Sequence, residues 1–148
     1  MNVADIGNPA QPRVLLICSQ PSLTCSALYC LNGMGAQIVA AGDPRLRFLR
    51  FSRFCETFVT CEVYQADPDH FVARVTELAD EHRVDIIVPG DNDSQLLLAD
   101  VKDRLKIPVF PIPTTQQLVR LNDKHAFHDT CAQIGVPVPA SVFVSDKH

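Results

Sequence analysis

Short apolar runs alternate with amphipathic stretches along most of this chain. Residues 13–19 (RVLLICS) form a continuous apolar run, which is typical of a strand buried on both faces of a parallel sheet. Apolar residues then recur at helical spacing from Leu23 to Met34, and Gly33 and Gly35 mark the expected helix end. Four further short runs predict strands, the second of them at a sheet edge, at 37–41, 57–61, 85–89 and 107–110.

More helices complete the alternation. Asp67 and Pro68 are a typical N-cap and first helical residue, and apolar side chains then recur on one face as far as His82. A further helix is expected over 92–105, and a short one within the less regular stretch 45–56. Strands that alternate with helices predict an α/β fold, which is an open, mostly parallel sheet of about five strands with helices on both faces, Rossmann-like in arrangement.

The tail departs from this alternation. Residues 114–117 (TTQQ) form a capping box, and Asn122 and Asp123 cap a second helix that ends at Gly135. Residues 140–144 then predict a short strand, either the start of another domain or an addition to the edge of the sheet. We therefore expect three segments: a flexible leader at 1–12, a Rossmann-like domain at 13–113, and a helical linker with the start of a truncated second domain at 114–148.

Composition and charge narrow the class of protein. The 148 residues carry a net charge of −4, which gives no general attraction to nucleic acid or to an anionic membrane surface. No apolar run approaches the roughly 18 residues of a membrane helix, and the N-terminus does not resemble a secretory signal, so we expect a cytoplasmic protein. The six cysteines contain no C-x-x-C pair, which favours buried free thiols over a zinc site.

The first strand-to-helix turn, residues 18–24, excludes the common nucleotide motifs. It contains no glycine, so a dinucleotide pyrophosphate has no close backbone approach, and the chain has no P-loop. Ser19, Ser22 and Thr24 could offer hydroxyl and amide groups to an anion at the helix start. Simple N-capping by these hydroxyls is the favoured alternative.

Two segments offer candidate ligand contacts. Four arginines (45, 47, 50 and 53) follow the second strand within nine residues and form either an anion-binding patch or a solvated surface, with Arg53 the candidate for a substrate contact. The second segment follows the strand at 85–89, at the sheet edge where ligands bind in such folds. Its residues are candidates for substrate binding, or else for a turn and helix cap: Gly90, Asp91, Asn92, Asp93 and Ser94. No metal ligands and no catalytic nucleophile are evident.

The tail also carries a family resemblance. Residues 121–127 (LNDKHAF) and 134–139 (IGVPVP) resemble the junction of ATP-grasp enzymes such as biotin carboxylase, D-alanine–D-alanine ligase and carbamoyl phosphate synthetase. In that family a helix that opens with Asp-Lys precedes a G-[IV]-P-x-P turn. The segments 51–54 (FSRF), 87–91 (IVPGD) and 111–114 (PIPT) are similar to parts of the family's N-terminal domain. The resemblance spans about residues 13–144.

The resemblance implies a function for a longer parent enzyme, which would be an ATP-dependent carboxylate–amine ligase that works through an acyl phosphate. It implies that Lys124 contacts ATP phosphates, and that ATP and Mg²⁺ act in the parent but are not stably bound by this chain. The expected partners are the remainder of the ATP-grasp domain, a small-molecule carboxylate and, left open, a second copy of the chain. Alone, the chain is expected to be catalytically inactive. The alternative is a stand-alone Rossmann-like ligand-binding, structural or dimerisation module.

Overall fold

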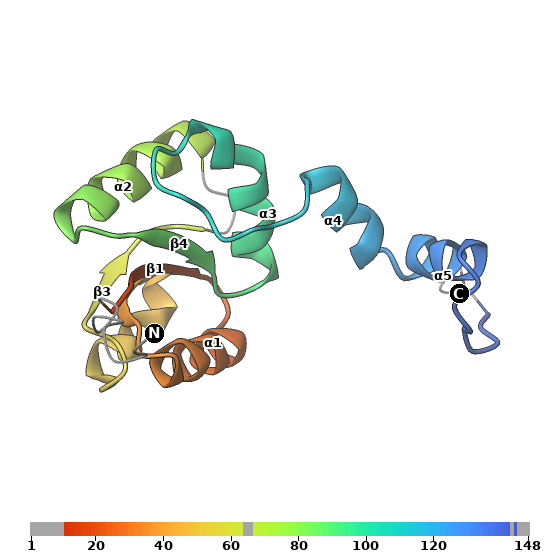
Figure 1. Ribbon diagram of the computed structural model, residues 1–148, viewed down its shortest axis with the longest axis horizontal. Helices are drawn as coiled ribbons and strands as arrows, with labels where there is room; N and C mark the ends of the chain where they lie inside the picture. The colour runs from red at the N-terminus through yellow and green to blue at the C-terminus, as the bar shows by residue number, and fades with distance from the viewer. Residues whose placement is uncertain (1–10, 64–66, 143, 145–148) are drawn as a thin grey trace, which may run out of the picture. The chain divides into compact units, whose positions relative to one another are not determined.

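The computed structural model describes residues 11–63, 67–142 and 144, so that most of the expected leader lies outside it. The described residues form two compact units, which divide between Ile112 and Pro113. The first unit contains nine of the elements labelled in Figure 1 or placed by its colour bar: β1 (Arg13–Cys18), α1 (Pro21–Gly33), β2 (Gln37–Gly42), η2 (Pro44–Phe51), β3 (Thr57–Thr60), α2 (Pro68–Glu81), β4 (Ile86–Pro89), α3 (Asn92–Val101) and η3 (Lys102–Arg104).

The four strands form one parallel sheet in the order β3-β2-β1-β4. Leu15 pairs with Val39 on one side of β1 and with Ile87 on the other, so the continuous apolar run lies at the centre of the sheet. β3 lies at the edge, as the sequence predicts. The expected α/β, Rossmann-like fold class is confirmed, because every strand-to-strand connection carries a helix and returns to a parallel strand.

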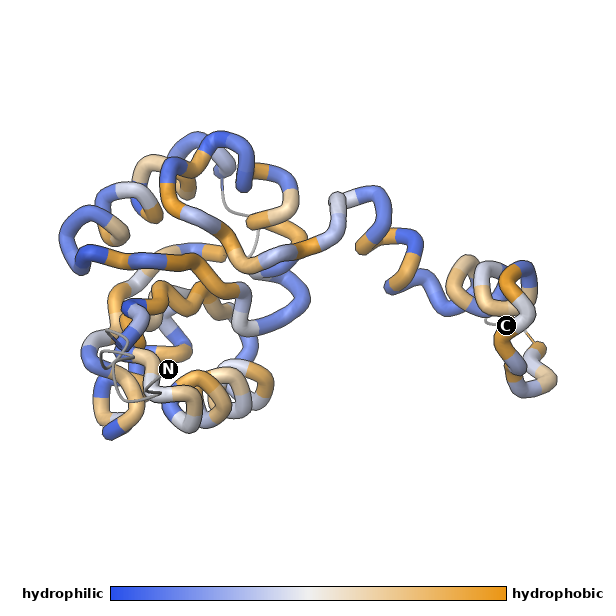
Figure 2. The backbone as a smooth tube through the Cα atoms, in the orientation of Figure 1, coloured by the Kyte–Doolittle hydropathy of each residue, from blue (hydrophilic) through white to orange (hydrophobic). Residues whose placement is uncertain are grey.

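Helices cover both faces of the sheet (Figure 1). On one face, Leu15 and Ile17 of β1 pack with α2 and α3 through Phe71 and Leu98. On the other face, Leu16 packs with buried residues of α1 and η2. Side chains of a strand alternate between the two faces, so each face needs its own apolar residues, and hydrophobic residues accordingly follow one another along the central strands in Figure 2.

The expected fifth strand is reduced to a single bridge between Ile87 and Val109. Two backbone hydrogen bonds make this bridge, from Ile87 N to the carbonyl of Pro108 at 2.9 Å and from Phe110 N to the carbonyl of Ile87 at 2.8 Å. Pro108 and Pro111 lack the N–H groups that would continue a ladder. The helix expected over 92–105 is also shorter, because α3 ends at Val101 and a 3₁₀ turn follows it.

The second unit consists of α4 (Thr115–Asn122) and α5 (Lys124–Gln133). Both begin as the sequence predicts. Thr114 and Gln117 form a reciprocal capping box at α4, and the Asp123 side chain accepts a hydrogen bond from Ala126 N at the start of α5. Gly135 has a φ of +75°, the left-handed conformation that glycine adopts after a helix end.

The strand expected over 140–144 is not present in its described part, residues 140–142 and 144, while residue 143 lies outside the described residues. A strand exists only where a neighbouring strand accepts its backbone hydrogen bonds. Among the described residues of this unit there is no such neighbour.

Candidate functional site

Asp91 joins the two strand ends at the carboxyl edge of the sheet. Its Oδ2 accepts hydrogen bonds from the backbone N–H groups of Ser19 and Gln20, which follow β1. Its Oδ1 accepts from the Ser19 hydroxyl at 3.0 Å and from Ser94 N at 2.9 Å. A single buried carboxylate therefore caps α3 and holds the first strand-to-helix turn against it.

The environment of Asp91 favours its ionised form. Burial opposes ionisation, but three backbone N–H groups and one hydroxyl donate to the carboxylate, and together they lower the pKa of Asp91 below its ordinary value of 3.8. This charge has no counter-ion at the site among the described residues and is stabilised by dipoles alone. Asp91 is thus an acceptor whose lone pairs are already used, which suits a structural role better than proton transfer.

Asp93 is the second residue of α3, two positions beyond the cap, and is only partly buried. Its Oδ2 accepts from the Ser19 hydroxyl at 3.1 Å and from the Gln20 side-chain amide at 3.2 Å. Asn92 is exposed, whereas Ser94 is fully buried and its hydroxyl bonds to the Asp91 backbone. Asp93 therefore adds a second carboxylate contact to the first turn after β1.

A pocket of about 360 Å³ opens beside this loop. Gly90 contributes its backbone, since its N–H donates to the carbonyl of Ile17 at 2.7 Å and an added Cβ would lie 3.0 Å from that same oxygen. Leu23 and Gln95 reach the pocket from α1 and α3. Its wall is completed by residues 88–91 of the strand end and residues 110–112 of the segment after it.

The helix cap anticipated for the loop 90–94 is confirmed by the capping box of Asp91 and Ser94, and a role of these residues in substrate binding stays a prediction. Capping of α1 by a hydroxyl is wrong. Its N-cap is Gln20, which makes no side-chain cap, and the Thr24 hydroxyl donates to the Gln20 carbonyl instead. The bridge from Asp91 to the first turn is not visible in the sequence, because it joins residues 72 positions apart.

Arg53 does not line the pocket beside Gly90. Its guanidinium carbon lies 4.8 Å from the centre of the ring of Phe54, which lines a second pocket between α1 and η2. The structure therefore does not bring Arg53 and the loop 90–94 into one lining, and a substrate contact by Arg53 stays a prediction. This second pocket could not be inferred from the sequence, because its aromatic lining comes from two separate elements.

Lys124 is the first residue of α5 and is exposed. Among the described residues its ammonium group has no hydrogen bond and no ion pair. The preceding side chain, Asp123, is engaged by the Ala126 backbone. A cation at a helix N-terminus is slightly disfavoured by the helix dipole, and an anion bound there is favoured. Lys124 thus presents an exposed ammonium group at the N-terminal end of α5.

Neither unit offers a site for a bound metal ion in its described part, where no three histidine, cysteine or acidic side chains come together. All six cysteines are free thiols. Four of them are buried as expected, but Cys25 and Cys30 are exposed on α1, which corrects the interpretation of the thiols as core residues. None of the described helices has the length and apolarity that a membrane crossing needs.

Comparison with known proteins shows similarity to solved structures at the level of the fold. No protein-family model and no curated protein matches the sequence. The structure is similar to the biotin carboxylase domain of the Hydrogenobacter thermophilus 2-oxoglutarate carboxylase, which was solved as a dimer with MgADP, ADP and bicarbonate. For that pair the TM-score is 0.54 and the sequence identity 18%, over 84% of this chain and 28% of the other.

Two synthetases give similar scores. The N5-carboxyaminoimidazole ribonucleotide synthetase of Thermotoga maritima has a TM-score of 0.56 at 15% identity, over 92% of this chain and 34% of its own. The N5-carboxyaminoimidazole synthetase of Staphylococcus aureus, solved with ADP, has a TM-score of 0.54 at 16% identity, over 84% of this chain and 30% of its own. The chain thus spans about a third or less of the structures it matches. The resemblance to biotin carboxylase seen in the sequence is confirmed at the level of the fold.

Proposed function

We propose that this chain is the N-terminal, substrate-side domain of an ATP-grasp ligase that joins a carboxylate to an amine through an acyl phosphate. One observation carries the proposal, namely that a fold shared with nucleotide-bound carboxylase and synthetase structures continues, in the same chain, into a helix that opens with Asp123 and an available Lys124. The Gly-Val-Pro-Val-Pro turn at 135–139 follows that helix, in the order that the family resemblance implies.

Lys124 is the proposed phosphate contact. Its ammonium group is exposed and unpaired among the described residues, and a phosphate there would gain that charge and the favourable end of the α5 dipole. A second cation, the adenine contacts and the acidic ligands of Mg²⁺ are proposed to come from the remainder of the ATP-grasp domain. These 148 residues alone are therefore proposed to turn over no ATP and to hold neither ATP nor Mg²⁺ stably.

The pocket beside Gly90 is the proposed substrate side. It lies at the carboxyl edge of β1 and β4, the position at which ligands bind in open α/β sheets. Of the loop 90–94, Gly90 and Asp91 line this pocket, and Asn92, Asp93 and Ser94 are proposed as substrate contacts outside its lining. Arg53, near the other pocket, is the weaker member of this set. We place the parent enzyme in the cytoplasm and include a homodimer among its states, as in the Hydrogenobacter structure.

The coding sequence after His148 is the first test. The proposal expects it to continue with roughly 150–250 residues of ATP-grasp character, enough for a further domain. The longer product is then purified, and ADP release is measured with bicarbonate and small carboxylates. Release of ADP that depends on one of these carboxylates supports the proposal. A native stop codon after His148 contradicts it and favours a stand-alone ligand-binding or structural module.

Lys124 is tested in the same longer product. Lys124→Ala is expected to raise the ATP concentration for half-maximal rate about tenfold, because one charge-assisted phosphate contact is lost. Lys106→Ala is the matched control, an exposed lysine outside α5, and should leave that concentration unchanged. If both variants need the same ATP concentration for half-maximal rate, Lys124 does not contact ATP. The 148-residue chain alone is expected to release no ADP.

A further inference from the structure

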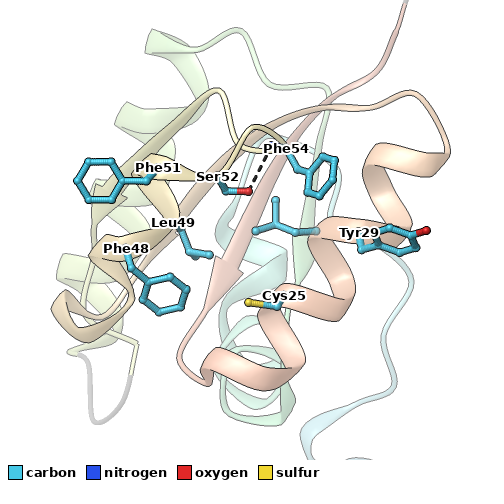
Figure 3. Close-up of a pocket in the computed structure, with 8 residues that line it drawn as sticks. Cys25, Tyr29, Phe48, Leu49, Phe51, Ser52 and Phe54 are labelled. Atoms are coloured by element: carbon cyan, nitrogen blue, oxygen red, sulfur yellow. Dashed lines mark hydrogen bonds between the residues drawn. The ribbon is translucent and has the colours of Figure 1, made fainter.

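The second pocket of the first unit lies between α1 and η2 and has a volume of about 390 Å³ (Figure 3). The buried side chains of Leu28 and Leu49 form part of its lining. Cys25 and Phe48 lie across the opening from each other in Figure 3. The remaining contributors are Tyr29, Phe51, Ser52 and Phe54. The pocket is thus mostly aromatic and aliphatic, and no acidic side chain lines it.

Three of these aromatic side chains are exposed to solvent and are not part of the buried core. Tyr29 is 69% exposed, Phe51 78% and Phe48 43%. Tyr29 meets the ring of Phe54 edge-on, with centroids 6.1 Å apart and planes at 82°, so part of the rim is fixed by packing. In Figure 3 the Phe48 ring lies on the pocket side of η2, whereas the Phe51 ring extends away from α1. Exposed aromatic residues that line one hollow indicate a binding surface rather than isolated surface residues.

Two arginines lie beside this aromatic lining. The guanidinium carbon of Arg50 is 4.6 Å from the centre of the Phe51 ring, and that of Arg53 is 4.8 Å from the centre of the Phe54 ring. Among the described residues neither guanidinium has a carboxylate partner, whereas Arg45 on the same helix pairs with Asp43 at 3.5 Å. A chain with a net charge of −4 therefore carries two guanidinium groups, without a carboxylate partner in the part that the structure describes, against rings that line this pocket.

These charges indicate what kind of ligand fits. In a two-fold dimer through this surface the same patch would face itself, so that Arg50 and Arg53 would face arginines, and the lining offers no acid to compensate them. A ligand with a flat apolar body and a negative group at one edge satisfies both features. Its ring contacts the aromatic side chains, and its anion reaches a guanidinium that is already oriented by stacking.

We propose that the pocket between α1 and η2 binds a small aromatic anion, a flat ring system that carries one carboxylate or phosphate. A volume of about 390 Å³ falls within the range of roughly 300–1,000 Å³ that is usual for small-molecule sites. The proposed site is separate from the pocket beside Gly90 and from Lys124, and it does not depend on the ligase proposal.

Indole compounds are suitable probes because the chain contains no tryptophan, so that ligand fluorescence is free of an indole background from the protein. The anisotropy of indole-3-propionate, indoxyl phosphate, 3-methylindole and tryptamine is followed as the chain is titrated in. We expect saturable binding of an anion that is at least about tenfold tighter than that of the neutral compound, and weakest binding of the cation. The stronger of the two anions identifies the carboxylate or the phosphate as the preferred group.

Variants separate charge from apolar contact. The double change Arg50→Gln with Arg53→Gln should weaken binding of the preferred anion about tenfold and leave 3-methylindole unchanged. Phe48→Ser should weaken the binding of both the preferred anion and 3-methylindole. Arg45→Gln is the matched control on the same helix and should change neither. All substituted side chains are exposed, and circular dichroism with a thermal melt checks that each variant is folded.

Several results would overturn the proposal. These are equal binding of the anion, the neutral compound and the cation, an absence of saturable binding by either anion, or an unchanged anion affinity in the folded double variant. Sedimentation covers one more case. A concentration-dependent dimer that Phe48→Ser abolishes would assign this surface to a second copy of the chain instead.

Discussion

At the scale of single residues, Asp91 shows how one side chain can set the geometry of a sheet edge. Each of its two oxygens accepts two hydrogen bonds, from the first turn after β1 and from the start of α3. A helix cap normally uses one oxygen for one helix. In this protein the Oδ2 atom of Asp91 holds the turn that follows β1. The wall of the pocket beside Gly90 is therefore held in place by hydrogen bonds.

The Asp91→Asn variant is expected to lose about 2–3 kcal/mol of unfolding free energy, because either orientation of the amide faces two N–H or O–H donors with an NH₂ group. Asp67→Asn is the control, since Asp67 is an exposed cap that accepts one hydrogen bond from His70 N, and asparagine caps nearly as well, so a change of at most about 0.5 kcal/mol is expected. Urea denaturation at neutral pH measures both. Equal losses would show that the bridge to Ser19 adds nothing.

The same carboxylate predicts a pH dependence. The pKa of Asp91 is lowered in the folded protein, so its contribution to stability is present above the ordinary value of 3.8 and is lost as pH falls through the folded value. Wild-type protein should therefore lose stability steeply below about pH 4, and Asp91→Asn should show a shallower loss there. Parallel profiles for the two proteins would place the acid sensitivity in other groups.

The thiols give a second test at this scale. Burial raises the pKa of Cys18 to about 12 and that of Cys61 to about 11, whereas Cys25 and Cys30 are exposed. We expect two thiols to react rapidly with Ellman's reagent and the four buried ones to react only as the fold opens. The double variant Cys25→Ser with Cys30→Ser should lose the rapid phase. A rapid phase that survives in it would show that a buried thiol is accessible.

At the scale of elements, close contacts between strand ends decide which residues the sequence can hold there. A Cβ on Gly42, at the end of β2, would lie 2.1 Å from the Cys18 carbonyl oxygen. A Cβ on Gly33, at the end of α1, would meet nothing within 4 Å. The glycine at the strand end is thus fixed by tertiary packing, and the one at the helix end is not.

Gly42→Ala is expected to destabilise the protein by at least about 3 kcal/mol, because backbone must move to relieve the contact. Gly33→Ala is the matched control and should be neutral or should stabilise by up to about 1 kcal/mol, since alanine loses less backbone entropy in a helix. Thermal and urea melts of the two variants provide the comparison. Similar behaviour of both would mean that β1 and β2 separate easily at their carboxyl ends.

At the scale of the whole molecule, the main core belongs to one unit. Both apolar clusters, one on each face of the sheet, are built from residues between Leu15 and Ile112. The second unit contributes a helix pair in which Leu118 and Cys131 are buried. The core of the first unit is therefore complete without the residues that follow Ile112.

A chain that ends at Ile112 is accordingly expected to fold, and to unfold in a single transition within about 5 °C of the full chain. Differential scanning calorimetry of both chains checks this. A matched chain that ends at Val101 lacks the bridge of Val109 to β4 and should melt clearly lower. If removal of the second unit cost as much as this shorter truncation, the two units would not be independent in stability.

The sequence by itself determined the order of the elements and most of their limits. The run 13–19 is too apolar for any place but the centre of a sheet, and local signals such as Asp67-Pro68 and the Thr114–Gln117 box act within one helical turn, so both could be inferred from spacing alone. Lys124 at the start of a helix was also accessible in this way, because its position depends only on its neighbours.

Only the tertiary structure decided what joins these elements. The expected fifth strand is only one bridge, because proline lacks the N–H donor that a partner strand needs. The strand expected near Val142 has no partner strand in the described part of its unit. The Asp91 bridge to Ser19 and the pairing of Tyr29 with Phe54 join residues far apart in the chain. Contacts of this kind leave no periodic trace in a sequence, and both candidate pockets are built from them.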